Sequence, residues 1–248
     1  MSVRFRPGVV PTLFALGAVT ALCALGTWQV KRLVWKQGLV AEWNARIDQP
    51  PATLDAVLAD PEAFQYRRVH ARGVYATEDS ILVEPVPRGL LEGARLLTPL
   101  RVGGPDAPGP WILVDRGWIP VGERERFLAS DRSLEPVAVT GLAFALAPTD
   151  AVPGTRATRR VHWLRFDPTR AAQVAELQAQ LPERLARVLV QREDTGDGRL
   201  PLGGFERPRS RVDHRSYAIT WYSMAAIAAG VWVGFGIQQG RAQGVGSA

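Results

Sequence analysis

A single histidine marks the start of a long uncharged segment near the end of the chain. His214 is followed three and seven residues later by Tyr217 and Trp221, and a helix would place these three side chains on one face. Arg215, directly after the histidine, adds a cation to this group. One imidazole, aromatic rings and a positive charge therefore gather where a membrane span would begin.

A second uncharged segment, bounded by Arg6 and Lys31, lies at the other end of the chain. If both segments cross the membrane as a hairpin, the end of the first and the start of the second emerge on the same face. Trp28, Gln29, Lys31 and Arg32 should then approach the start of the second span, including His214.

This combination suits a flat apolar ligand with carboxylate tails. Haem fits, because an imidazole can ligate its iron axially while arginine or lysine pairs with its propionates. The alternative is an aromatic belt with a solvated histidine at a helix start. The candidate ligand-binding residues are His214, Trp28, Tyr217, Trp221, Arg32 and Arg215, with His214 as the ligand to haem iron.

Both segments are long enough to span a membrane. Residues 8–30 and 216–239 could each cross the ~30 Å hydrocarbon layer as helices that rise ~1.5 Å per residue. The first could instead be a cleaved signal peptide, but its apolar part is longer than such peptides carry. Two spans place both termini on one side of the membrane and residues 31–215 on the other. Arginine and lysine near the span ends favour a cytoplasmic domain, although this rule weakens for long translocated domains.

Composition narrows the possible functions of the central domain. The formal charge of +6 is not gathered into a long basic block, so the sequence gives no sign of nucleic-acid binding. The only cysteine, Cys23, lies in the first span, which leaves the domain without a disulfide or a Cys-x-x-Cys-His haem attachment site. With methionine only at Met1 and Met224, a soft-ligand copper site is also disfavoured.

The domain is predicted to be mostly antiparallel β-structure. The first helix should continue past the membrane and end before Pro50-Pro51, and residues 53–60 form a short helix capped by Thr53. Strand-length runs separated by glycine and proline follow, and a helix from residue 167 to about 181 interrupts them. The predicted strands are residues 69–75, 80–86, 94–102, 111–119, 136–146, 161–166 and 185–191. The fold class is therefore α+β: a two-helix transmembrane hairpin enclosing an antiparallel sheet or barrel-like domain with an inserted helix.

Catalytic motifs are weak in this domain. Asp115-Arg116 lies at a predicted strand end, where a structural ion pair or a turn is the commoner explanation. His70 and His162 lie in predicted strands and are interpreted as packing or surface residues. Asp213, His214 and Ser216 include the residue types of a catalytic triad, but their adjacency along one helix start does not supply its geometry.

Small residues recur at four-residue spacing in both spans. They could allow the two helices, or helices of a partner, to approach closely. These residues are Gly17, Ala21, Ala226, Gly230 and Gly234. Neither span carries a charged side chain, which disfavours a transport pathway.

Four motifs occur in an order that resembles the surfeit-locus family of cytochrome c oxidase assembly factors. They are Gly-Thr-Trp-Gln from Gly26 with Arg32 and Trp35-Lys36, Tyr66-Arg67-Arg68-Val69 with Gly73 and Tyr75, Val114-Asp115-Arg116-Gly117-Trp118-Ile119-Pro120, and His214-Arg215-Ser216-Tyr217-Ala218-Ile219-Thr220-Trp221-Tyr222. The resemblance covers nearly the whole chain, including both spans.

The resemblance implies a non-enzymatic protein of the inner membrane that helps to build haem-copper oxidase. It implies a periplasmic domain, cytoplasmic termini and, as for some bacterial members, binding of haem a for transfer to the large oxidase subunit. Haem a synthase and membrane lipid are further expected partners. His214 matches the histidine implicated in haem binding, whereas Asp213 stands where members often carry asparagine. The short stretch before the first span leaves no room for a transit peptide, which indicates a bacterial protein. A scaffold that binds no cofactor and a membrane-anchored hydrolase remain as alternatives.

Overall fold

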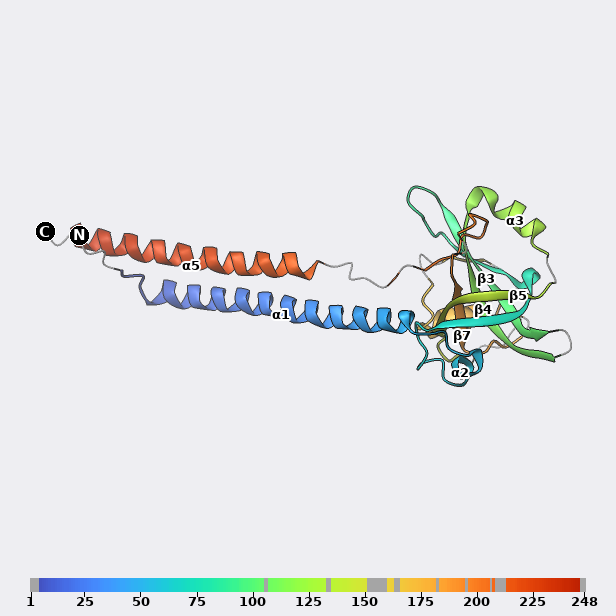
Figure 1. Ribbon diagram of the computed structural model, residues 1–248. Coiled ribbons are helices and arrows are strands. Elements are labelled where there is room, and N and C mark those ends of the chain that lie inside the picture. Colours follow the sequence, from blue (N-terminus) through green and yellow to red (C-terminus); the bar gives the residue numbers. More distant parts are fainter. Residues whose placement is uncertain are drawn as a thin grey trace. The chain divides into compact units, whose positions relative to one another are not determined.

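The computed structural model describes residues 5–104, 107–132, 135–150, 160–162, 166–181, 183–194, 196–205, 207 and 213–245. The chain divides into two compact units, whose elements are labelled in Figure 1. One unit is formed by Met1–Glu42 together with Pro208–Ala248, and the other is the sheet domain, Trp43–Arg207. The division falls inside a continuous helix, which ends at Asp48 before Pro50-Pro51, as the sequence predicts.

Two long apolar helices form the first unit. Helix α1 is Val9–Asp48 and helix α5 is His214–Val245, and both are long and apolar enough to cross a membrane. Their large apolar side chains remain exposed; Phe14, for example, is 81% exposed and Val231 67%. A core helix of a soluble protein would bury such side chains, whereas a helix in lipid presents them to its surroundings. The pair is consistent with a membrane protein.

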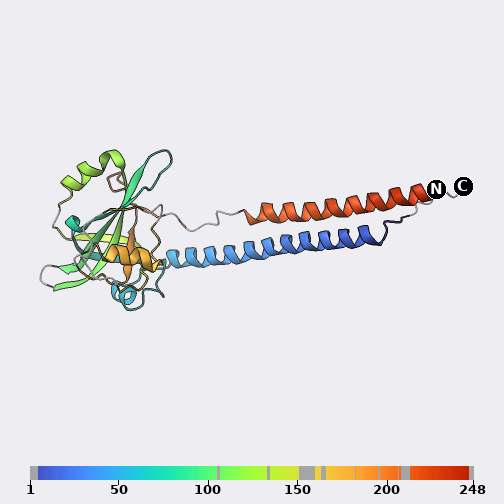
Figure 2. The same ribbon diagram turned by 180° about the vertical axis from the view of Figure 1, so that it is seen from behind.

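The two helices run antiparallel and lie side by side, as Figures 1 and 2 show. Near the start of α1, Trp232 Nε1 donates to Thr12 Oγ1 at 3.2 Å, and the ring of Phe5 meets Trp232 edge-on with centroids 5.1 Å apart. Further along, the hydroxyl groups of Thr27 and Tyr222 are 3.0 Å apart. The predicted helical hairpin is therefore confirmed.

The close approaches between the helices lie outside the predicted small-residue stripe. A methyl group added at Gly17, Gly230 or Gly234 would meet nothing within 4 Å, so the prediction is wrong for contacts between these two helices. The chain instead comes close at Gly26, where an added Cβ would lie 2.9 Å from the ring of Tyr222. The stripe failed because helical spacing shows which residues share a face, but not which face meets the neighbour.

The second unit is built on one sheet of seven strands within the described residues. Its strands are β1 Arg68–Tyr75, β2 Ile81–Glu84, β3 Gly93–Gly104, β4 Ala107–Pro120, β5 Val137–Ala145, β6 Arg160–His162 and β7 Val188–Arg192. Its short helices are α2 Leu54–Ala59, α3 Arg124–Ser130 and α4 Ala171–Gln178, with single 3-10 turns η1 Thr77–Asp79 and η2 Val121–Glu123.

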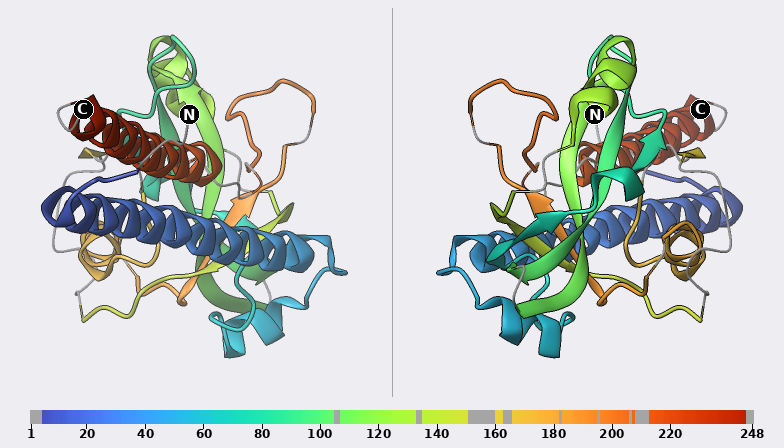
Figure 3. Two further views of the ribbon diagram at one scale, coloured as in Figure 1. Left: turned by 90° about the vertical axis from the view of Figure 1, so that its left-hand side faces the viewer. Right: turned by 90° about the vertical axis from the view of Figure 1, so that its right-hand side faces the viewer.

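Five of these strands close a barrel in the order β1-β5-β7-β4-β3, because β3 also pairs back with β1 through Tyr75 and Leu100. The first half of β3 leaves the barrel to pair with β2, which in turn pairs with β6. Among the strand pairs that the structure describes, only β4–β7 and β2–β6 are parallel, so the sheet is mostly antiparallel, as predicted. Figure 3 shows the domain from two opposite sides, with α2 and α3 at opposite edges of it.

Three apolar clusters hold the domain together. Alternate residues of the barrel strands fill its interior, where Val69, Leu100 and Val114 are fully buried, and Val57 of α2 joins them. Helix α4 covers the outside of β2, β3, β4 and β7. Helix α3, which the sequence analysis did not predict, places Phe127 and Leu128 against a third cluster on β2, β3 and β4. A seven-residue helix with one apolar pair gives little periodicity to read.

Candidate functional site

His214 is the first residue of α5, and Asp213 caps that helix. The Asp213 carboxylate accepts from the backbone N–H of Ser216 at 3.1 Å and from the Ser216 hydroxyl. These two bonds lower the pKa of the Asp213 carboxyl group below its usual range. The described contacts of Asp213 therefore secure the helix start, and the imidazole is oriented by another residue.

That residue is Gln29 of α1. Its side-chain oxygen lies 2.8 Å from His214 Nδ1. His214 is buried, with only 7% of its surface exposed. An amide oxygen can only accept, so Nδ1 is the donor to Gln29, and in the neutral imidazole Nε2 then presents its lone pair. This Nε2 is buried and has no hydrogen-bond partner among the described residues.

The arrangement is compatible with a metal-binding histidine. Ligating histidines usually donate one ring N–H to a carbonyl or carboxylate, which fixes the ring and leaves the other nitrogen to the metal. Among the described residues, no cluster of three or more histidine, cysteine, aspartate or glutamate side chains could hold a bare metal ion. A lone imidazole suits an iron that brings its own equatorial ligands, as haem does.

The other predicted site residues differ in their surroundings. Trp28 and Tyr217 are more than half exposed, at 56% and 55%, and Arg215 is also exposed. The Arg32 guanidinium lies 4.2 Å from the ring centroid of Trp35, and Trp221 is partly buried. Of the predicted approaches to His214, the hydrogen bonds of the described residues bring only Gln29 into contact with it.

One contact beside the site escaped the sequence analysis. Gly26 leaves room for the ring of Tyr222, whose hydroxyl meets Thr27. Because the Thr27 hydroxyl donates to the Cys23 carbonyl at 2.9 Å, Tyr222 is the donor to Thr27. This contact lies close to His214 along both helices and holds them together there. The glycine before Thr27 was the only signal for it in the sequence.

The Asp115-Arg116-Gly117-Trp118 motif has structural roles in the barrel. Asp115 accepts from Arg95 Nε at 2.7 Å and from the backbone N–H of Gly117 at 3.1 Å. Gly117 has a φ of +127°, and a Cβ there would lie 2.2 Å from the carbonyl oxygen of Leu202. Trp118 Nε1 donates to the carbonyl of Val86 at 2.7 Å. At Asp115 the structure thus contains the structural ion pair that the sequence analysis favoured, and the partner is Arg95.

The two histidines of the domain lie in strands. His70 is exposed, and its Nδ1 is 2.8 Å from the Thr140 hydroxyl, its partner across β1 and β5. His162 ends β6, and its side chain lies outside the described part of the chain. The cross-strand pair accounts for His70 as a surface residue.

Comparisons with known proteins cover both helices and the domain. The family model described as the SURF1 family matches residues 16–226. A SURF1-like protein of Monosiga brevicollis is 30% identical over 221 residues, which is 84% of this chain and 81% of that protein. Surfeit locus protein 1 of Homo sapiens is 27% identical over 230 residues, 86% of this chain and 73% of the human protein. A SURF1-like protein of Drosophila melanogaster is 26% identical, covering 84% and 71%.

Proposed function

Because the chain belongs to the SURF1 family, we propose that it is a membrane-bound assembly factor for cytochrome c oxidase, which binds haem a through His214 and assists its insertion into the large oxidase subunit. The observation that carries the haem proposal is the buried, unpartnered Nε2 of His214, with Nδ1 held by Gln29. Haem a is here the cargo, and the protein's part is to bind and orient it.

Each residue of the site has a distinct role in this proposal. His214 supplies the axial nitrogen, and Gln29 fixes the tautomer and the angle of the ring. Arg215 directly follows the histidine, and Arg32 lies on the facing helix α1. Both are exposed cations, and they pair with the propionates. Trp28 and Tyr217, both more than half exposed, cover the apolar macrocycle. Trp221, one turn further along α5, extends that aromatic surface.

The proposed location is the inner membrane of a bacterium, with both termini cytoplasmic and the barrel domain periplasmic. The antiparallel pairing of α1 and α5 supports the placement of both termini on one side, because two antiparallel spans return the chain to its starting face. Lipid surrounds the exposed apolar faces of both helices. The large oxidase subunit and haem a synthase are the proposed partners.

The proposed role is to bind and hand over haem a, without catalysis. The described residues that line one pocket of the domain offer the hydroxyls of Thr77 and Thr140 and include no serine, cysteine or histidine. The Thr140 hydroxyl at that pocket meets His70, but His70 is exposed on the barrel surface.

The test is the absorption spectrum of the full chain purified from cells that make haem a. The wild-type protein should carry a Soret band, and His214→Ala should lose it. Gln29→Leu, which keeps the helix but removes the acceptor for Nδ1, should weaken haem binding about tenfold or more. The matched control is His70→Ala, which removes an exposed histidine of the domain and should retain the wild-type spectrum. A Soret band unchanged in His214→Ala would remove this residue from the mechanism.

A cofactor-free scaffold is the second candidate, and one feature of the domain favours it. Leu90 and Leu91, at the tip of the β2–β3 connection, are 103% and 61% exposed, as expected of side chains that a partner protein covers. The scaffold predicts that the large oxidase subunit co-purifies with the chain whether or not haem a is made. Replacing both leucines with serine should then reduce recovery of the subunit, while His214→Ala should not.

A further inference from the structure

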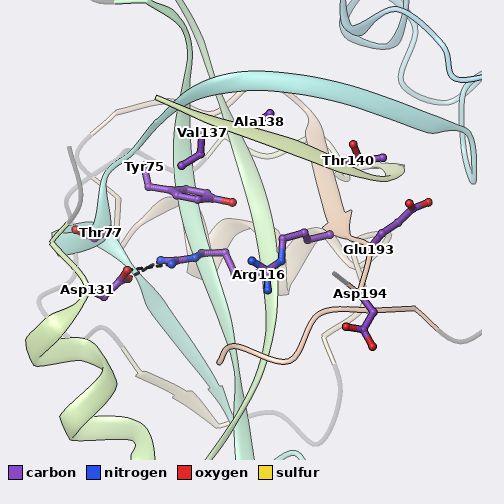
Figure 4. Close-up of a pocket in the computed structure, with 10 residues that line it drawn as sticks. Tyr75, Thr77, Arg116, Asp131, Val137, Ala138, Thr140, Glu193 and Asp194 are labelled. Carbon is purple, nitrogen blue, oxygen red and sulfur yellow. Dashed lines mark hydrogen bonds and ion pairs between the residues drawn. The ribbon is translucent and has the colours of Figure 1, made fainter. Parts of the chain in front are cut away.

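One mouth of the barrel holds a pocket of about 390 Å³, well away in sequence from His214 (Figure 4). The end of β1, the middle of β4, the start of β5 and the end of β7 meet here, and the pocket is lined by Tyr75, Arg116, Val137 and Arg192 among others. Tyr75 belongs to the apolar cluster inside the barrel, which α2 also joins through Val57. Mouths of small barrels are frequent ligand sites.

Three hydrogen-bonding groups at this mouth lack partners among the described residues. They are the hydroxyl of Tyr75, Nε of Arg116 and Nε of Arg192. Tyr75 is 9% exposed and Arg116 7%, so neither relies on bulk solvent. A guanidinium can only donate, and a buried donor without an acceptor is unfavourable. The three groups call for a ligand with acceptor oxygens.

Three carboxylates line the pocket, Asp131, Glu193 and Asp194, and none of them forms an ion pair with Arg192 among the described residues. Asp131 is occupied by Arg116, which reaches it through Nη1 at 2.5 Å and Nη2 at 3.0 Å, as Figure 4 shows. Glu193 pairs with Arg68 at 2.6 Å. Within the described part of the chain, Arg192 donates to the carbonyl of Pro201 but forms no ion pair with a carboxylate. Asp194 also lines the pocket and accepts from the backbone N–H of Gly196 at 3.0 Å, so what Arg192 offers a ligand is its unpartnered Nε donor rather than a net positive charge.

An irregularity in the sheet aims Arg116 at the pocket. The register of β3 against β4 shifts so that Leu96 faces Gly117 and Leu97 faces Asp115, which leaves Arg116 as the extra residue of a bulge. Bulges re-aim side chains and often lie beside functional sites. The Arg116 guanidinium lies 4.5 Å from the centroid of the Tyr75 ring. In the Asp115-Arg116 motif, Asp115 thus pairs with Arg95 in a structural role, whereas Arg116 pairs with Asp131 and lines the pocket.

We propose that this pocket binds a carboxylate group, which accepts from the Tyr75 hydroxyl and pairs with Arg192, while Arg116 closes the site from the β4 side. The pocket is larger than a carboxylate alone, and Val137 and Ala138 provide apolar contacts for the organic group attached to it. Burial raises the pKa of the Tyr75 hydroxyl against the opposing influence of Arg116 and Arg192, so the hydroxyl stays protonated and can donate. The carboxylate could belong to a small organic acid or to the end of a polypeptide.

The experiment is an NMR titration of the full chain in nanodiscs, following the arginine Nε–H signals and the amide signals of Thr140 and Asp194. The probes are sodium acetate, triglycine, its amide triglycinamide, and sodium phosphate, each compared with sodium chloride at the same ionic strength. Acetate or triglycine should cause saturable shifts in these signals, and triglycinamide should not. Saturation by acetate identifies a small acid as a sufficient ligand, whereas saturation by triglycine alone identifies a polypeptide end.

Two variants test the assignment of residues. Tyr75→Phe keeps the ring that packs in the barrel and should weaken carboxylate binding about tenfold, because one hydrogen bond to a charged group is lost. The matched control is Tyr66→Phe, the same chemical change outside the pocket, which should bind as the wild type does. Shifts that chloride reproduces, that Tyr75→Phe leaves unchanged, or that phosphate causes while neither carboxylate does, would overturn the proposal. This outcome is independent of haem binding at His214.

Discussion

Replacing Asp131 with asparagine should destabilise the barrel by about 3 kcal/mol. Arg116 and Asp131 form a two-pronged ion pair whose side chains are only 9% and 11% exposed. The asparagine retains one acceptor but loses the charge and one of the two hydrogen bonds, which leaves the Arg116 guanidinium buried without compensation. A hydrogen bond to a charged group contributes roughly 1.5–3 kcal/mol, and breaking a buried pair costs roughly 3–5 kcal/mol. The lower end applies because the amide oxygen still accepts.

Hydrogen–deuterium exchange of the full chain in detergent, read by mass spectrometry, measures this change locally. The most protected peptides of β4 and β7 should exchange roughly a hundredfold faster, since about 1.4 kcal/mol corresponds to a factor of ten. Peptides of α5 belong to the other compact unit and should keep their wild-type rates.

Two further variants decide whether burial is the cause. Glu123→Gln removes one partner of an exposed pair with Arg126, whose side chains are 48% and 85% exposed, and should change the opening free energy by less than about 1 kcal/mol. The double variant Arg116→Met with Asp131→Leu replaces the buried pair with apolar groups and should recover most of the lost stability. If Asp131→Asn matched Glu123→Gln, the reasoning from burial would be refuted.

Three other predictions follow from the domain. Gly117→Ala should cost about 2 kcal/mol or more, seen in the same exchange experiment, because its φ is positive and the new methyl group would meet the Leu202 carbonyl; a neutral result would show that the bulge can relax. In an absorbance titration of tyrosinate, the wild-type curve minus the Tyr75→Phe curve isolates Tyr75. This difference should rise at a higher pH than the absorbance of an ordinary tyrosine, because the pKa of Tyr75 is raised. Stability linked to Tyr75 is thus fully present below about pH 10 and is lost as pH rises from there through the folded-state pKa; a difference curve with an ordinary midpoint would contradict this. The Asp48 carboxylate, exposed and hydrogen-bonded to Arg207, has a lowered pKa, so its contribution to stability is present above the ordinary aspartate range and lost as pH falls through the lowered value. Carboxyl NMR should show this midpoint rise in Arg207→Gln, and an unmoved midpoint would exclude the ion pair as the cause.

The local elements and the helical hairpin could be predicted from the sequence. The gap between Arg215 and Arg241 is a property of consecutive residues, and so is the run of short strands between glycine and proline turns. Order along the chain also implied that the region around Gln29 approaches His214, because two spans must form a hairpin. Each of these inferences depends on nearest neighbours in sequence or on one topological constraint.

Tertiary packing decided which of these neighbours actually touch. Barrel closure depends on a pairing between Tyr75 and Leu100, and the bulge at Arg116 depends on the register of β4 against β3, neither of which leaves a periodic signal in one strand. Gln29, rather than a neighbouring aromatic or Asp213, holds the imidazole of His214, because the rotation of each helix about its axis is fixed by packing along the whole pair. Sequence determined which groups could reach the helix start; only the fitted surfaces of the two helices determined which one does.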